Sequence, residues 1–141
     1  MKKSLLEKTT NKLVSAFLKN KIIAPLPKKY TKKLIDAQKL RKLCESKIRK
    51  PILGFKAAGT GIPVLKKLKE KEPFYASVFK HNVLKNNKIV KINKFTMGVE
   101  LEVCYLIKKN FFTFQNKVNK NNIKKFISHI APCIEVVGYR Q

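Results

Sequence analysis

The chain has 141 residues, 44% of them apolar, and its 33 Lys and Arg residues outnumber 8 Asp and Glu to give a formal net charge of +25. This length and apolar content suit one folded domain and exclude a largely disordered chain. The apolar runs are too short to cross a bilayer, and the first residues lack the pattern of a signal peptide, so we expect a cytoplasmic protein with no membrane partner.

The positive charge comes almost entirely from lysine, with 30 Lys and only three Arg. Contacts to phosphates and base edges favour the planar guanidinium of Arg, and the lysines are spread along the whole chain instead of forming one stripe. A solvated surface with a biased composition therefore explains the charge better than nucleic-acid binding as the main role. A small Lys-rich protein that binds nucleic acid or another polyanion is the alternative from a different functional class.

The three cysteines, Cys44, Cys104 and Cys133, are an odd number without C-x-x-C spacing. Each lies within an apolar pattern, which predicts buried free thiols. We expect neither a disulfide framework nor a zinc site.

Two helices are predicted in the first third of the chain. Ser4 is expected to cap the first helix, which ends near Lys19 and Asn20. Thr31 is expected to open the second helix, and Pro51 marks its end.

Shorter elements are predicted to follow. Residues 52–57 are typical of a strand. The segment 59–63 breaks that strand and starts a brief helix through Val64, Leu65 and Leu68. An apolar stretch covers 74–79. A turn at Asn86 and Asn87 precedes a predicted short strand over 89–92.

The last third contains the clearest strand pattern, an alternation over residues 95–107. After a loop over 108–119, apolar residues at i, i+3, i+4 and i+7 from Ile123 to Ile130 predict a helix that Pro132 ends. A final strand is predicted over 133–137. The order of helices and strands predicts an α+β fold.

Three of the eight carboxylates lie on these last two predicted strands. The i, i+2 spacing of Glu100 and Glu102 sends both side chains to one face, while Val99, Leu101 and Val103 take the other. Glu135 lies in the middle of the final strand. Because like charges on one face repel each other, the cluster is a candidate metal site, and pairing with lysines is the alternative.

Six short segments of the chain together carry a family resemblance. They are Ile23-Ala24-Pro25-Leu26, Ile35-Asp36-Ala37, Leu53-Gly54-Phe55-Lys56-Ala57-Ala58-Gly59-Thr60, Glu72-Pro73-Phe74-Tyr75, Val99-Glu100-Leu101-Glu102-Val103 and Ala131-Pro132-Cys133-Ile134-Glu135-Val136-Val137-Gly138-Tyr139-Arg140. In this order they resemble the 2-keto-4-pentenoate hydratase family of the fumarylacetoacetate hydrolase superfamily. The family includes the related 2-oxo-3-hexenedioate decarboxylases.

The resemblance implies a two-part organisation. Residues 1–92 would form a helical N-terminal α/β region, and residues 93–141 would begin the metal-binding catalytic region with the first strands of a mixed β-sheet roll or barrel. Because family members continue further, we expect a truncated form, with a homo-oligomer or a companion chain supplying the missing C-terminal half.

The resemblance also implies a site and a reaction. Glu100, Glu102 and Glu135 would be the ligands of Mg²⁺ or Mn²⁺, and the substrate would be a small 2-oxo-4-enoic acid that a lyase enolises and hydrates. Lys56 and Arg140 match the family's Lys and Arg, which would act on the substrate. The alternatives are that the two glutamates on the first strand face solvent, that Lys56 is a surface residue, and that Arg140 forms an ion pair.

The chain also departs from the family pattern. An acidic segment that the family carries after the Pro-Phe-Tyr region is replaced here by Lys80-His81-Asn82. His81 is a candidate replacement base, and a surface histidine is the alternative. Hydratase and decarboxylase are not distinguished at this length.

Overall fold

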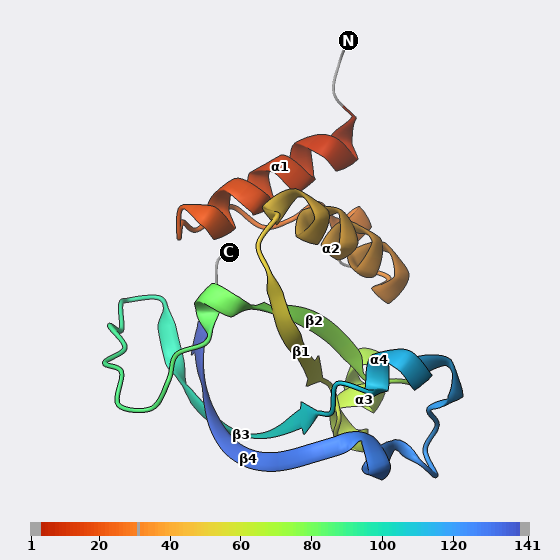
Figure 1. Cartoon of the computed structure of the whole chain (residues 1–141). Coiled ribbons are helices and arrows are strands. Elements are labelled where there is room, and N and C mark those ends of the chain that lie inside the picture. Colours follow the sequence, from red (N-terminus) through yellow and green to blue (C-terminus); the bar gives the residue numbers. More distant parts are fainter. Residues whose placement is uncertain (1–3, 31, 139–141) are drawn as a thin grey trace. The chain divides into compact units, whose positions relative to one another are not determined.

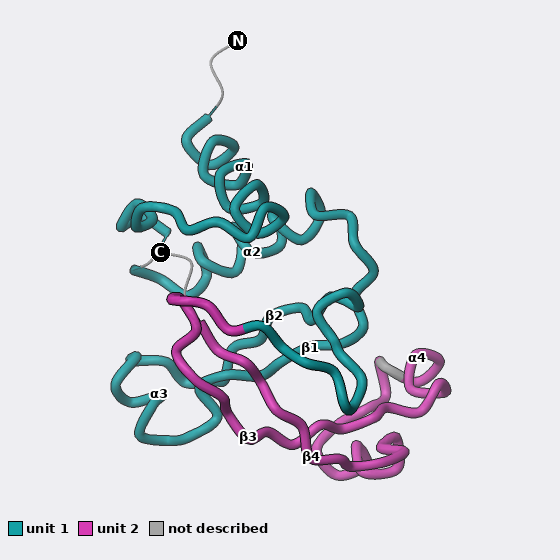
Figure 2. The backbone as a smooth tube through the Cα atoms, turned by 90° about the vertical axis from the view of Figure 1, so that its left-hand side faces the viewer, with its two compact units in different colours: residues 1–91, 140–141 teal, residues 92–139 magenta. Residues whose placement is uncertain are grey.

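A computed structural model describes residues 4–30 and 32–138 of the chain. The chain divides into two compact units, one of residues up to Lys91 and one that begins at Ile92, shown in two colours in Figure 2. The first unit contains the helices α1 and α2 and a β-hairpin, and the second is built around a longer hairpin (Figure 1).

Helix α1 (Leu5–Leu18) begins as the sequence predicts. The Ser4 side chain accepts a hydrogen bond from the backbone N–H of Glu7, which satisfies one of the free donors at the helix start. Thr9 and Thr10 are buried, and their hydroxyls donate to the carbonyl oxygens of Leu5 and Leu6, each at 2.8 Å. These bonds remove the cost of burying a hydroxyl without a partner.

Helix α2 (Leu34–Ile48) packs against α1 and follows a short 3₁₀ turn, η1 (Lys28–Tyr30). Its N-cap is Lys33, whereas the predicted capping residue, Thr31, lies outside the described residues. The helix ends at Ile48, and its C-cap residue Arg49 adopts a left-handed conformation. This end lies just before Pro51, which predicts it. The buried side chains of Tyr30, Leu40 and Ile48 form part of the core of this unit.

The first hairpin pairs β1 (Ile52–Ala58) with β2 (Phe74–Phe79), and α3 (Ile62–Leu68) lies between them in the sequence. Gly59 begins the connection with a φ of +68°, and a Cβ at this position would come 2.9 Å from the Phe74 ring. The left-handed backbone and the close approach therefore both favour glycine at this position. A 3₁₀ turn, η2 (Lys80–Asn82), follows β2, and the predicted strand over 89–92 is wrong because those residues form no regular structure.

Glu45 connects α2 to the first hairpin. Its carboxylate accepts hydrogen bonds from the Arg41 guanidinium at 2.6 Å and from the backbone N–H of Ser77 at 3.2 Å. Desolvation alone would raise the pKa of Glu45, but the hydrogen bonds from Ser77 and Arg41 outweigh it and lower that pKa. The charged carboxylate is thus favoured in the folded protein.

Replacing this carboxylate is expected to destabilise the first unit. Glu45→Ala should reduce the free energy of unfolding by about 1–2 kcal/mol, because it removes charge-assisted hydrogen bonds from a partly buried position. Since the folded pKa is lowered, this stabilisation is present above the ordinary carboxylate pKa and is lost as the pH falls through the folded value. Urea unfolding at several pH values measures both effects. The exposed Glu72→Ala is the control, and equal losses in the two variants would contradict the account.

The second unit pairs β3 (Thr96–Ile107) with β4 (Ile127–Gly138) in an antiparallel hairpin. The long connection contains α4 (Phe111–Phe114) and the 3₁₀ turns η3 (Gln115–Lys117) and η4 (Ile123–Phe126). Strand β3 confirms the strand that the alternation over residues 95–107 predicts.

The predicted helix from Ile123 to Ile130 is wrong. Only a 3₁₀ turn forms at its start, and Ile127 begins β4. Pro132 does not end a helix but lies within β4 opposite Val103. Each strand of a two-stranded sheet has a free edge, so a proline without an N–H is tolerated there. Strand β3 presents twelve residues for pairing, and β4, which is equally long, provides backbone hydrogen-bond partners along the shared edge.

The described residues thus confirm a mixed helix and sheet fold of the α+β type. Their strands form two separate two-stranded sheets, and no barrel is closed among the described residues. None of the helices in the described part of the chain has the length and apolar character needed to cross a membrane.

Candidate metal centre

The β3–β4 hairpin places the three predicted glutamates by its register. Glu100 lies directly opposite Glu135, and Glu102 lies opposite Cys133. Because side chains alternate along a strand and directly opposed residues share a face, all three glutamates project from one face of the hairpin. The other face carries the exposed apolar side chains of residues that include Leu101 and Ile134.

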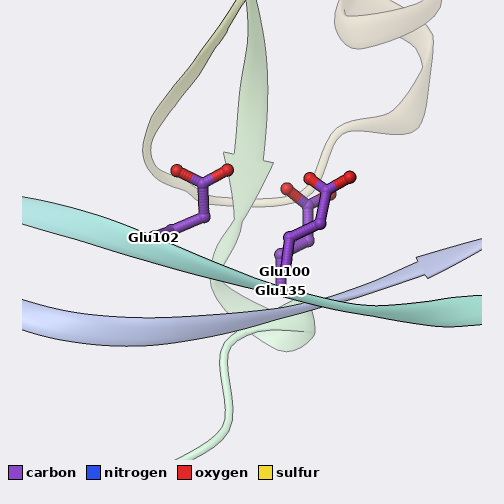
Figure 3. A group of neighbouring side chains, drawn as sticks. All are labelled: Glu100, Glu102 and Glu135. Atoms are coloured by element: carbon purple, nitrogen blue, oxygen red, sulfur yellow. The ribbon is translucent and has the colours of Figure 1, made fainter.

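The three carboxylates converge. One oxygen from each of Glu100, Glu102 and Glu135 can be chosen so that all three lie within 4.8 Å of one another. Figure 3 shows the three side chains pointing to the same side of the two strands. Glu100 and Glu102 are exposed, and Glu135 is partly buried.

The chemistry of this donor set fits a hard divalent cation. Mg²⁺ and Mn²⁺ prefer oxygen ligands, and three carboxylates leave further coordination positions for water or substrate. Without a cation, like charges that face each other across a strand pair destabilise the hairpin. A bound divalent ion would turn this repulsion into attraction, so the residues present fit the metal that the resemblance implies.

Of the three other residues with predicted roles, two belong to the first unit and one lies outside the described residues. Lys56 belongs to the first unit, where it is exposed on β1 opposite Ala76. Arg140 lies outside the described residues. The ring of His81 lies 5.9 Å from those of Phe17 and Phe79, so aromatic packing within the first unit accounts for this side chain.

The cysteines differ from the prediction of buried thiols. All three are free, but Cys104 and Cys133 are exposed and Cys44 is only partly buried. Burial, as the larger cause, and the charge of Glu45, as the smaller one, raise the pKa of the Cys44 thiol to about 11. This thiol therefore stays protonated at neutral pH.

Cys104 and Cys133 lie on the same hairpin face as the glutamates, which the sequence analysis missed. The alternation that places the glutamates on one face also predicts this position of the cysteines. Cys104 follows Glu102 by two residues, and Cys133 precedes Glu135 by two.

Comparisons with known proteins add no family assignment. No protein-family model matches the chain, and neither the curated proteins nor the solved structures that were searched contain a match.

Proposed function

We propose that this protein is a divalent-metal-dependent lyase of the 2-keto-4-pentenoate hydratase type, acting on small 2-oxo-4-enoic acids. The observation that carries the proposal is the convergence of three glutamate carboxylates within 4.8 Å on one hairpin face. The segments that resemble the hydratase family supply the substrate class.

The three glutamates would hold the cation, and the exposure of Glu100 and Glu102 leaves room for a small anionic substrate. A bound Mg²⁺ or Mn²⁺ would supply Lewis-acid stabilisation of the negative charge that develops on the 2-oxo oxygen. In the reaction, the double bond shifts into conjugation with the 2-oxo group. Water then adds its oxygen to the distal alkene carbon and a hydrogen to the proximal one, giving a 4-hydroxy-2-oxo acid.

Among the residues with predicted roles, only the three glutamates support the proposal by their positions. The resemblance assigns Lys56 and Arg140 to the substrate, but Lys56 belongs to the first unit and Arg140 lies outside the described residues. Their roles in binding the substrate carboxylate or in proton transfer are therefore proposals from the resemblance.

An assay with Mn²⁺ and 2-hydroxypenta-2,4-dienoate, the enol form of 2-keto-4-pentenoate, tests the activity. The ultraviolet absorbance of the dienol should fall with enzyme and metal together, and Glu102→Gln should lower the rate by at least about a hundredfold, since it removes a ligand of the group that stabilises charge. Release of CO₂ from 2-oxo-3-hexenedioate would instead favour the decarboxylase of the same family. The absence of both reactions in protein that binds Mn²⁺ would contradict the lyase proposal.

A second candidate function, polyanion binding, is favoured by the distribution of charge. Residues 1–91 carry 25 Lys and Arg against 5 Asp and Glu, whereas residues 92–139 carry 7 against 3. Such an excess of positive charge would attract a polyanion to the first unit over a long range. Strongly salt-dependent binding of an oligonucleotide that is unchanged in Glu102→Gln, without any response to Mn²⁺, would favour this candidate.

A further inference from the structure

The hairpin face opposite the glutamates is apolar and exposed. The register places Leu101 opposite Ile134 and Tyr105 opposite Ile130, so these side chains share one face, which we call the apolar face. Six of its side chains are each between 55% and 85% exposed; they are Val99, Leu101, Val103, Tyr105, Ile130 and Ile134. Contiguous exposed apolar surface of this kind marks an interaction site in a soluble protein.

The described residues of the second unit form no buried core of their own. None of them is buried, whereas the first unit buries residues such as Leu40 and Phe79. A single two-stranded hairpin is at best marginally stable in water and needs a further layer against its hydrophobic face. A partner surface on the apolar face would therefore stabilise the hairpin.

The apolar face is large enough for a stable interface between two proteins. Its six exposed side chains offer an area on the order of 800 Å², which is what each partner contributes to an interface of standard size. The apolar faces of two sheets pack about 10 Å apart, with their side chains interdigitated. A second sheet face of the same size would therefore cover this one.

The distribution of charge favours a second copy of this chain as the partner. Within residues 99–105 and 130–136, every charged side chain belongs to a glutamate on the opposite face. Two copies can therefore meet face to face without burying a charge. Residues 92–139 carry only 7 Lys and Arg against 3 Asp and Glu, whereas residues 1–91 carry 25 against 5, so the copies would approach each other through the less charged unit.

We propose that the apolar face is a homodimer interface, in which the β3–β4 hairpins of two chains pack face to face around a two-fold axis. The same patch on both subunits is the self-complementary arrangement of such a dimer. The glutamates project from the opposite face, so each subunit would keep its own cation site accessible. This inference goes beyond the lyase proposal and does not rest on it.

Sedimentation velocity of the full chain over a range of concentrations tests the interface. The wild-type protein should sediment as a dimer, with twice the chain mass of 16.3 kDa. Leu101→Lys and Ile134→Lys should each weaken dimerisation at least about a hundredfold, because each would bury an unpaired ammonium group. Leu101→Ala, which removes apolar area without adding a charge, should weaken it at least about tenfold. Circular dichroism shows whether the variants fold, and Leu101→Ala decides the test if the lysine variants do not.

Cys104→Lys is the matched control for the lysine variants. It adds the same charge to the same strand, at an exposed position on the glutamate face. Because this face lies outside the proposed interface, Cys104→Lys should leave the dimer unchanged.

A wild-type chain that stays monomeric at about 100 μM, far above the micromolar dissociation constant of a weak interface of this size, would overturn the proposal. If such a monomer unfolds in Leu101→Lys, a surface other than a second copy covers the apolar face. An equally tight dimer in Leu101→Ala and the lysine variants, or loss of the dimer in Cys104→Lys, would also overturn it. A dimer without any response to Mn²⁺ would contradict the lyase and support the interface, whereas a monomer that responds to Mn²⁺ would do the reverse.

Discussion

Glu102→Gln is expected to abolish the rise in melting temperature that Mn²⁺ or Mg²⁺ gives the wild-type protein. A ligand that binds only the folded state stabilises it by about 2.7 kcal/mol at a concentration one hundred times its dissociation constant, which corresponds to a shift of several degrees. The variant keeps the shape of the side chain and removes one anionic ligand. Differential scanning fluorimetry with and without the cation measures the effect.

The melting temperature of the metal-free protein provides a second test of the glutamate cluster. Glu100 faces Glu135 directly, so Glu100→Gln should raise the melting temperature in the absence of a cation, because it removes repulsion between opposed like charges. It should also remove the response to Mn²⁺. Glu72→Gln, an exposed glutamate of the first unit, is the control that should keep the full response. A full Mn²⁺ response in both Glu100→Gln and Glu102→Gln would contradict the metal site.

Phe79→Ala is expected to cause the largest loss of stability of any substitution considered. Phe79 is only 4% exposed at the end of β2, and its ring centroid lies 5.3 Å from that of Phe17 on α1. Removing a buried ring loses its transfer free energy and leaves a cavity, at a cost of about 3–5 kcal/mol. That is a large part of the total stability of a typical domain.

Phe55→Ala is the matched control, because it makes the same chemical change in the same hairpin. Phe55 is 65% exposed and contacts only the Tyr75 ring among the aromatic residues described. Its loss should cost about 1 kcal/mol. Urea unfolding curves of the two variants give the comparison, and similar midpoints would show that the interface of α1 with β2 is not the core of this unit.

The sequence predicted those elements whose local signals agree with their packing. Ser4 marks the start of α1, Pro51 marks the end of α2, and the alternation around Glu100 predicts β3. In each case a capping oxygen, a missing N–H or a period of two acts within a few residues. Such signals do not depend on distant parts of the chain.

The failure at Ile123 to Ile130 has the opposite cause. The spacing of its apolar residues suits a helix, yet pairing with β3, some twenty residues earlier, makes most of the segment a strand. β-Branched residues such as Ile127 and Ile130 favour a strand once such a partner exists. Local periodicity does not contain this information.

The candidate site was predictable in part for the same reason. Alternation places Glu100 and Glu102 on one face without any knowledge of the fold. The position of Glu135 opposite Glu100 depends on a strand register, which the sequence alone did not supply. The exposure of Cys104 and Cys133 depends on whether a layer covers that face, so an apolar pattern alone wrongly predicted burial.

The most direct test of the metal site is the position of a bound ion. Crystals of the protein grown with Mn²⁺ should show one anomalous scattering peak on the glutamate face, at about 2.0–2.3 Å from an oxygen of each of Glu100, Glu102 and Glu135. A peak elsewhere, or three carboxylates that each pair with a lysine ammonium in the presence of saturating Mn²⁺, would contradict the account.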